Sequence, residues 1–261
     1  MRITNELAQN TATLSVGKRP MRNMIFRERV FLKIQGDGAR AILAMAVIAL
    51  SLSVPVSAQA EHPITGRRIA PVMGMSGADW LARREREREE MPEKVIQQLH
   101  LRPGMVVADI GAGTGYYSIR IAREVAPNGK VLANDIQAGM LARVRENAAN
   151  AHLSNVETIL GSESNPHLPT GQVDLAIMVD VYHELSRPQR MLEHIHDALR
   201  PGGQLVLLEF RKEDPSVPIR LEHKMSVDEI KAEIQPEGFH FVQTIESLPW
   251  QHMVFFEKTG N

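Results

Sequence analysis

Apolar runs rich in β-branched residues recur along the chain, and a carboxylate stands at the end of each of the four clearest. The runs are 105–108, 131–133, 175–179 and 205–208, and the acids are Asp109, Asp135, Asp180 and Glu209. Stretches with helical periodicity separate the runs, and this alternation predicts parallel strands buried on both faces of one sheet. We therefore expect a doubly wound α/β fold with the four acids at one edge, where such sheets bind ligands.

The same pattern predicts the remaining elements. A helix is expected over 116–124, and a second one over 78–90, where Glu and Arg three and four positions apart indicate a solvated face. Ser226 and Glu229 have the spacing of a capping box that opens a helix to Ile234. The segments 239–242 and 252–256 are expected to be the last two strands, and 211–225 is too irregular for a core element.

Three glycines at every second position follow the first strand. Gly111, Gly113 and Gly115 allow positive φ angles and a close approach of the backbone to a ligand, and the helix that follows directs its free N–H groups at the same place. The dinucleotide fingerprint requires a further glycine at position 116, where this chain has tyrosine. The pattern therefore disfavours a pyrophosphate and leaves a nucleoside ligand.

The segment from Asp109 to Gly115 resembles the first motif of the class I S-adenosylmethionine-dependent methyltransferases, and the chain is similar to their ubiquinone/menaquinone group from about residue 76 to 258. The resemblance implies a Rossmann-like, doubly wound, mostly parallel seven-stranded sheet with an antiparallel C-terminal strand. It also implies S-adenosylmethionine as cofactor, with its ribose at Asp135 and its adenine beside Ser162, where the family often has aspartate. The residues expected to bind the cofactor are Asp109, Gly111, Ala112, Gly113, Thr114, Gly115, Asp135, Ile136, Ser162, Glu163 and Asp180.

Methyl transfer from a sulfonium is an in-line displacement, which requires alignment and, for some acceptors, removal of a proton. His183 directly follows the fourth strand and has an ordinary pKa near neutrality, so it is the best general-base candidate, with Tyr182 beside it as a second catalytic candidate. The alternative is that His183 caps or packs against the next helix. Further possible acceptor contacts, each also open to a structural role, are His223, Lys224, Trp250 and His252.

The acceptor is expected to be a small or medium organic molecule. The Asn/Asp-Pro-Pro-aromatic signature of many amino-group methyltransferases is missing at 180–183, which favours an oxygen or carbon acceptor over nitrogen. One alternative is a protein carboxyl methyltransferase like the isoaspartate repair enzymes, which the segment 101–117 resembles. Another is a non-catalytic nucleoside-binding module of the cell envelope.

Composition excludes several classes of function. The net charge is −1, so no overall field attracts nucleic acid, and the chain has no cysteine. Disulfides, thiolate catalysis and thiolate metal sites are thereby excluded, and the arsenic methyltransferases, which depend on cysteines, are disfavoured. We also expect no metal site, since His183-Glu184 lacks the second histidine of a zinc-protease helix and His194 and His196 diverge. The oligomeric state stays open.

The first 60 residues have the layout of a secretory leader. Several Lys and Arg precede an uncharged apolar run that begins at Ala41 and continues through Val56, and a small-x-small site ends at Ala60. The apolar run is short for a membrane span, which needs about twenty residues. The expected organisation is a leader over 1–60, a linker packed along the surface over 61–77 and a methyltransferase domain over 78–261, exported without stable membrane insertion. The alternatives are a protein anchored in the inner membrane, or a cytoplasmic one if the start is mis-assigned.

If the leader is used, the mature protein begins at Glu61. We expect fractionation of cells that produce the full chain to recover a shortened protein outside the cytoplasm, and amino-terminal sequencing to read Glu-His-Pro-Ile. Recovery of full-length protein from the cytoplasm would contradict the export prediction.

Overall fold

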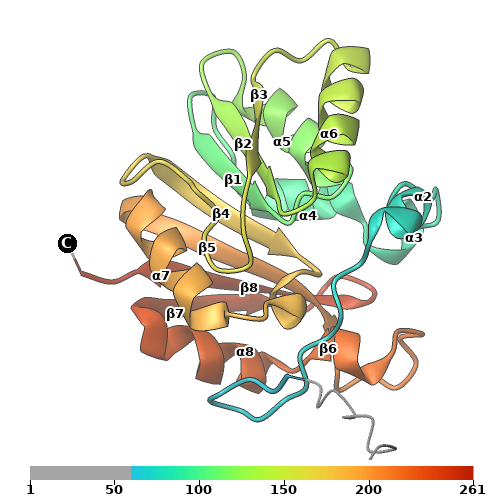
Figure 1. Cartoon of the computed structure of the whole chain (residues 1–261), viewed down its shortest axis with the longest axis vertical. Helices are drawn as coiled ribbons and strands as arrows, with labels where there is room; N and C mark the ends of the chain where they lie inside the picture. The colour runs from blue at the N-terminus through green and yellow to red at the C-terminus, as the bar shows by residue number, and fades with distance from the viewer. Residues whose placement is uncertain (1–59, 261) are drawn as a thin grey trace, which may run out of the picture. The chain divides into compact units, whose positions relative to one another are not determined.

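One sheet organises the part of the chain that this computed structural model describes, residues 60–260. Its strand order is β3-β2-β1-β4-β5-β8-β7, with the two-residue β6 beside β5 (Figure 1). Strand β8 pairs antiparallel with both neighbours, and the other pairings are parallel. The strands are β1 (Val106–Ile110), β2 (Lys130–Asp135), β3 (Val156–Leu160), β4 (Val173–Val179), β5 (Leu199–Arg211), β6 (Lys224–Met225), β7 (Phe239–Ile245) and β8 (Gln251–Lys258).

Helices cover both faces of this sheet, as the alternation of strands and helices predicts. One face packs against α4, α5 and α6, and the other against α7 and α8. Their bounds are α4 (Pro92–Gln98), α5 (Tyr116–Val125), α6 (Ala138–Asn150), α7 (Pro188–Ala198) and α8 (Val227–Ile234). The doubly wound fold and the antiparallel C-terminal strand are confirmed, and β6 raises the number of strands from seven to eight.

The crossover connections reverse direction between β1 and β4. Strand β1 pairs with β2 on one side and with β4 on the other, and Ile110 lies level with Asn134 and Met178. The carboxyl ends of these strands therefore meet at one edge of the sheet, at the switch point where open α/β sheets bind ligands.

The segment 78–90 differs from the single solvated helix predicted for it. It forms two short helices, α2 (Ala78–Leu81) and α3 (Arg86–Glu89). Arg86 and Glu90 are buried, and the Arg86 guanidinium binds the Glu90 carboxylate through two nitrogens, at 2.7 and 2.8 Å. A third nitrogen of Arg86 donates to the Leu81 carbonyl at the end of α2. The helical spacing of the charges therefore did not reveal that Arg86 and Glu90 face inward. Their ion pair lies at the junction between α2 and α3.

Residues 60–77, expected as a linker along the surface, contribute side chains to the interior. His62, Arg67 and Ile69 are buried, and Arg67 binds the fully buried Glu233 of α8 through Nε at 2.9 Å and Nη2 at 3.0 Å. Arg67 also donates to the His183 carbonyl at 3.0 Å. The segment therefore ties the turn after β4 to α8. The leader predicted for residues 1–60 lies, apart from Ala60, outside the described residues.

Two local predictions about the C-terminal half have clear outcomes. The Ser226 hydroxyl and the Glu229 carboxylate form the predicted capping box at the start of α8. The segment 211–225 is wrongly predicted as an irregular loop throughout, because Val217, Lys224 and Met225 are buried and the last two form β6. Within residues 60–260, no helix combines the length and apolar character required to span a membrane.

Arg67 should be among the residues on which stability depends most. Arg67→Ala leaves the Glu233 carboxylate buried without its guanidinium, so we expect a loss of about 3–5 kcal/mol in the free energy of unfolding measured with urea. The exposed neighbour Arg68 is the matched control, and Arg68→Ala should change it by less than about 0.5 kcal/mol. Equal effects of the two substitutions would contradict the role assigned to the buried pair.

Candidate functional site

A cavity of about 420 Å³ opens at the carboxyl ends of β1, β2 and β4. The glycine turn after β1, the Asn134–Gln137 segment after β2 and the Val179–Val181 segment after β4 form its floor. Trp80, Leu81 and Arg86 line it from α2 and α3, and the 218–223 segment contributes the facing wall. A smaller cavity of about 40 Å³ adjoins the glycine turn on the side of α5. The sheet edge predicted to bind a ligand is therefore hollow.

The glycine turn has the geometry that its sequence predicts. Gly111, Gly113 and Gly115 have φ angles of 71°, 55° and 85°, which residues other than glycine rarely adopt. A Cβ atom on Gly111 would lie 2.5 Å from a methyl carbon of Val181. Gly111 and Gly113 line the larger cavity, and Gly115 precedes the first residue of α5. The turn therefore brings main chain, without side chains, to the cavity surface.

Asp135 lies at the end of β2, beneath this turn. Its Oδ2 accepts the Gly113 N–H at 3.0 Å, and its Oδ1 accepts the Gln137 N–H at 2.8 Å. Burial raises the pKa of Asp135, and the backbone donors of Gln137 and Gly113 oppose that shift. Each carboxylate oxygen retains a further lone pair. The carboxylate is therefore fixed in place while it can still accept two hydrogen bonds from a ligand in the cavity.

Asp109 occupies a different position from Asp135. Its side chain is buried, accepts the Ser118 hydroxyl at 2.5 Å and lies against the smaller cavity. Burial raises the pKa of Asp109 to about 6, with hydrogen bonds from Ser118 opposing the shift. Asp109 therefore connects β1 to α5 and holds the glycine turn between them.

Asp180 follows β4 and carries a buried oxygen without a partner. Its φ of 54° is in the left-handed region, and its Oδ2 accepts from the Gln251 amide at 2.8 Å. Within the described residues, neither its Oδ1 nor the buried Tyr117 hydroxyl has a hydrogen-bond partner. Burial raises the pKa of Asp180 well above its ordinary value, and nearby Glu90 and Glu209 add to that shift. Since Asp180 lines the larger cavity, a cationic or donor group of a ligand would fit this oxygen.

The other residues predicted to bind the cofactor divide into two groups. Ile136 lines the larger cavity, and Ala112 and Thr114 line the smaller one. Ser162 and Glu163 line neither cavity, so their assignment to the cofactor stays a prediction. The Ser162 hydroxyl accepts the Asn165 N–H at 3.1 Å, and the Glu163 carboxylate accepts from the hydroxyl of Ser186 at 3.0 Å. Ser162 is thus held within the loop after β3, and Glu163 is held by a residue that precedes α7.

The two catalytic candidates diverge in the structure. His183 lines the cavity, and its Nδ1 lies 2.6 Å from Oε2 of the fully buried Glu209. Tyr182 is fully buried outside the lining, with its hydroxyl 3.4 Å from Nε2 of His62. Successive residues of the 3-10 turn Tyr182–Glu184 point in different directions, so Tyr182 packs in the core. The structure therefore supports His183 as a cavity residue and corrects the prediction for Tyr182.

Among the polar side chains of the cavity wall, Arg86 and Glu184 were not predicted as site residues, whereas His223 was suggested as an acceptor contact. Arg86 was assigned to a solvated face, Glu184 follows His183 directly in the sequence, and only His223 becomes a neighbour of His183 through folding. Among the other suggested contacts, Lys224 donates to the Val217 carbonyl at 2.6 Å, and His252 lies between Glu213 and Glu246. Lys224, Trp250 and His252 do not line the cavity, so their geometry favours the structural alternative.

Comparison with known proteins gives three kinds of match. A family model described as a methyltransferase domain matches residues 107–203. An arsenite methyltransferase of Halobacterium salinarum is 29% identical over 54% of this chain and 39% of its own length. A demethylmenaquinone methyltransferase of Symbiobacterium thermophilum is 31% identical over 53% of this chain and 52% of its own length. The chain thus spans about half or less of these two curated relatives.

A solved structure extends the similarity over the whole of a related chain. The S-adenosylmethionine-dependent methyltransferase from Aquifex aeolicus is 28% identical, and the match has a TM-score of 0.69. It covers 72% of this chain and 100% of that one. The methyltransferase similarity therefore includes the sheet edge that carries the cavity.

Asp135 provides a direct test of ligand binding at this edge. Asp135→Ala removes two carboxylate acceptors, and we expect affinity for S-adenosylhomocysteine, measured by calorimetry, to fall about tenfold to a hundredfold. Asp197→Ala, which removes an exposed carboxylate of α7 outside the cavity, should leave the dissociation constant unchanged. Unaltered affinity in folded Asp135→Ala protein would contradict the assignment of Asp135 to ligand hydroxyls.

Proposed function

Because the chain belongs to the class I S-adenosylmethionine-dependent methyltransferase family, we propose that it transfers a methyl group from this cofactor to a small organic acceptor. The observation that carries the proposal is the pair of carboxylates, Asp135 and Asp180, that flank the glycine turn in one cavity. One remains free to accept hydrogen bonds from hydroxyls, and the other has a buried oxygen without a partner among the described residues. A ligand with a ribose and a cationic amino acid end matches both.

The residues of the cavity fit this cofactor at three points. Asp135 would accept hydrogen bonds from the ribose hydroxyls, since both its oxygens are oriented by backbone donors. Asp180 Oδ1, which lacks a partner among the described residues, would accept a hydrogen bond from the ligand's amino group. Arg86 uses three of its nitrogens on Glu90 and the Leu81 carbonyl, and its remaining N–H groups would suit the ligand's carboxylate. When bound, the cofactor supplies a methyl group on a positively charged sulfur.

The acceptor is proposed to lie between His183 and the 218–223 segment. Leu185, Met191 and Ile219 line the cavity together with the polar His183, Glu184 and His223. Apolar side chains with a few polar groups among them are typical of pockets for organic molecules. His183 introduces a polar nitrogen there, which supports its assignment to the acceptor side.

The hydrogen bonding of His183 follows from its buried partner. A carboxylate only accepts hydrogen bonds, so Nδ1 of His183 is the donor to Glu209. The Nε2 lone pair is then available on the other side of the ring, toward His223. This supports a His183 that meets either the acceptor or a group that holds the acceptor.

The amino-acid composition and the relatives of the chain narrow the range of possible methyl acceptors. The chain has no cysteine, so we propose an organic acceptor instead of the arsenite of the Halobacterium protein. The demethylmenaquinone methyltransferase suggests aromatic carbon or oxygen as the acceptor atom, in agreement with the missing amino-group signature at 180–183.

The proposed function predicts turnover that depends on His183. With methyl-labelled cofactor and a panel containing a catechol, a phenol and a naphthoquinol, label should enter at least one acceptor. His183→Ala should lower the single-turnover rate by about two to four decades and leave affinity for S-adenosylhomocysteine nearly unchanged, because the proposed cofactor contacts are Asp135, Asp180 and Arg86.

His240→Ala is the matched control, since His240 is exposed on β7. It should change neither quantity. An isoaspartyl peptide in the same panel tests the carboxyl methyltransferase alternative. Binding of cofactor without transfer to any acceptor would instead favour the non-catalytic nucleoside-binding module.

A further inference from the structure

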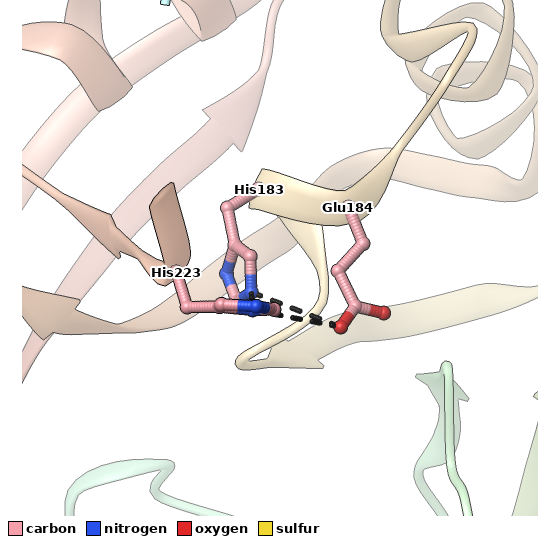
Figure 2. Close-up of side chains that lie close together, drawn as sticks. All are labelled: His183, Glu184 and His223. Atoms are coloured by element: carbon pink, nitrogen blue, oxygen red, sulfur yellow. Dashed lines mark hydrogen bonds and ion pairs between the residues drawn. The ribbon is translucent and has the colours of Figure 1, made fainter. Parts of the chain in front are cut away.

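Three side chains of the cavity wall form a cluster of potential metal ligands. His183 and Glu184 belong to the 3-10 turn Tyr182–Glu184, and His223 ends the 3-10 turn Leu221–His223. His183 Nε2 lies 3.1 Å from His223 Nδ1, and both nitrogens lie 3.9 Å from Glu184 Oε1. Figure 2 shows the two imidazoles and the carboxylate directed at one point from two separate segments.

The buried environment orients the first of these ligands. Glu209 Oε2 lies 2.6 Å from His183 Nδ1, and Glu209 Oε1 accepts the Tyr182 N–H at 2.9 Å. The Glu209 carboxylate therefore fixes both the position and the tautomer of the ring, and Nε2 presents its lone pair to the cluster. A carboxylate behind the distal nitrogen of a histidine is the usual support of a metal-bound imidazole.

We propose that His183 Nε2, His223 Nδ1 and the Glu184 carboxylate bind a divalent transition-metal ion of the zinc class. Ligand atoms about 2.1 Å from zinc lie about 3.4 Å apart in a tetrahedral set. The nitrogen–nitrogen distance of 3.1 Å is close to that value, and the two 3.9 Å distances close by a small rotation of the Glu184 side chain. Two imidazoles disfavour magnesium and calcium, which take oxygen ligands.

Charge in this part of the cavity favours a cation. Glu209 is fully buried, and its ion pair among the described residues is with His183. Asp180 and Glu184 line the same cavity. Three carboxylates so close together repel one another in a poorly solvated site, and a divalent ion among them offsets that repulsion.

Three protein ligands leave at least one coordination position of the ion open. Since His183, Glu184 and His223 all line the cavity, the open position faces the place proposed for the acceptor. An acceptor that offers an oxygen lone pair would bind there. In this arrangement His183 acts as a ligand, which replaces the general-base role predicted from the sequence.

The test measures metal binding by the untagged chain after treatment with a chelator. Calorimetry measures the binding of zinc, and visible absorption measures the binding of cobalt. We expect one zinc ion per chain, a cobalt spectrum typical of mixed nitrogen and oxygen ligands, and no binding of magnesium at millimolar concentration. His223→Ala and Glu184→Gln should each weaken zinc binding at least tenfold, and Glu209→Gln should weaken it about tenfold to a hundredfold through His183.

His240→Ala should bind zinc like the wild type, because that histidine lies outside the cluster. Circular dichroism identifies variants that fail to fold. If His223→Ala is one of these, Glu184→Gln is the ligand variant that tests the proposal. The proposal would be overturned if the folded wild type bound neither zinc nor cobalt stoichiometrically. It would also be overturned if His223→Ala and Glu184→Gln both bound zinc with the affinity of the wild type. Affinity for S-adenosylhomocysteine, measured on the same samples, tests the proposed function separately from the metal site.

Discussion

The parallel pairing of β1 with both β2 and β4 is the constraint on which the site depends. Parallel strands require crossover connections, and these reverse direction between β1 and β4, so three strand ends meet at an opening in the sheet edge, which α2 and α3 line from one side. Glycines then bring bare main chain to this opening, and Asp135 and Asp180 lie on either side of it. The cavity is a consequence of topology, while its chemistry comes from the residues just beyond the strands.

Buried ion pairs hold the walls of that cavity. Arg86 with Glu90 fixes the break between α2 and α3, and Arg67 with Glu233 fixes the N-terminal segment and the turn after β4. Each pair is buried, so removal of one partner lowers the stability of the fold far more than removal of one partner of a surface ion pair would. Such pairs specify where the covering segments lie.

The strands, the glycine turn and the acids at the strand ends were predictable because all of them depend on local signals. Apolar runs, the spacing of the glycines and an acid at a strand end can each be read within a few residues, and Asp135 and Gly111 lie where those signals predict. Tyr182 was wrongly assigned to the cavity because the direction of a side chain in a turn depends on its neighbours in space, and the core accommodates this one. The direction of the Ser162 side chain depends in the same way on Asn165, whose N–H its hydroxyl accepts.

The amino-acid sequence by itself determined the order of strands and helices, the glycine turn and the acids at the sheet edge, since these follow from periodicity and backbone preference. Only the tertiary structure decided which side chains meet across the cavity. His183 and His223 are 40 residues apart in sequence and 3.1 Å apart in space. Their contact, like that of Glu209 with His183, arises because separate crossovers return the chain to the same edge, and no local pattern records that.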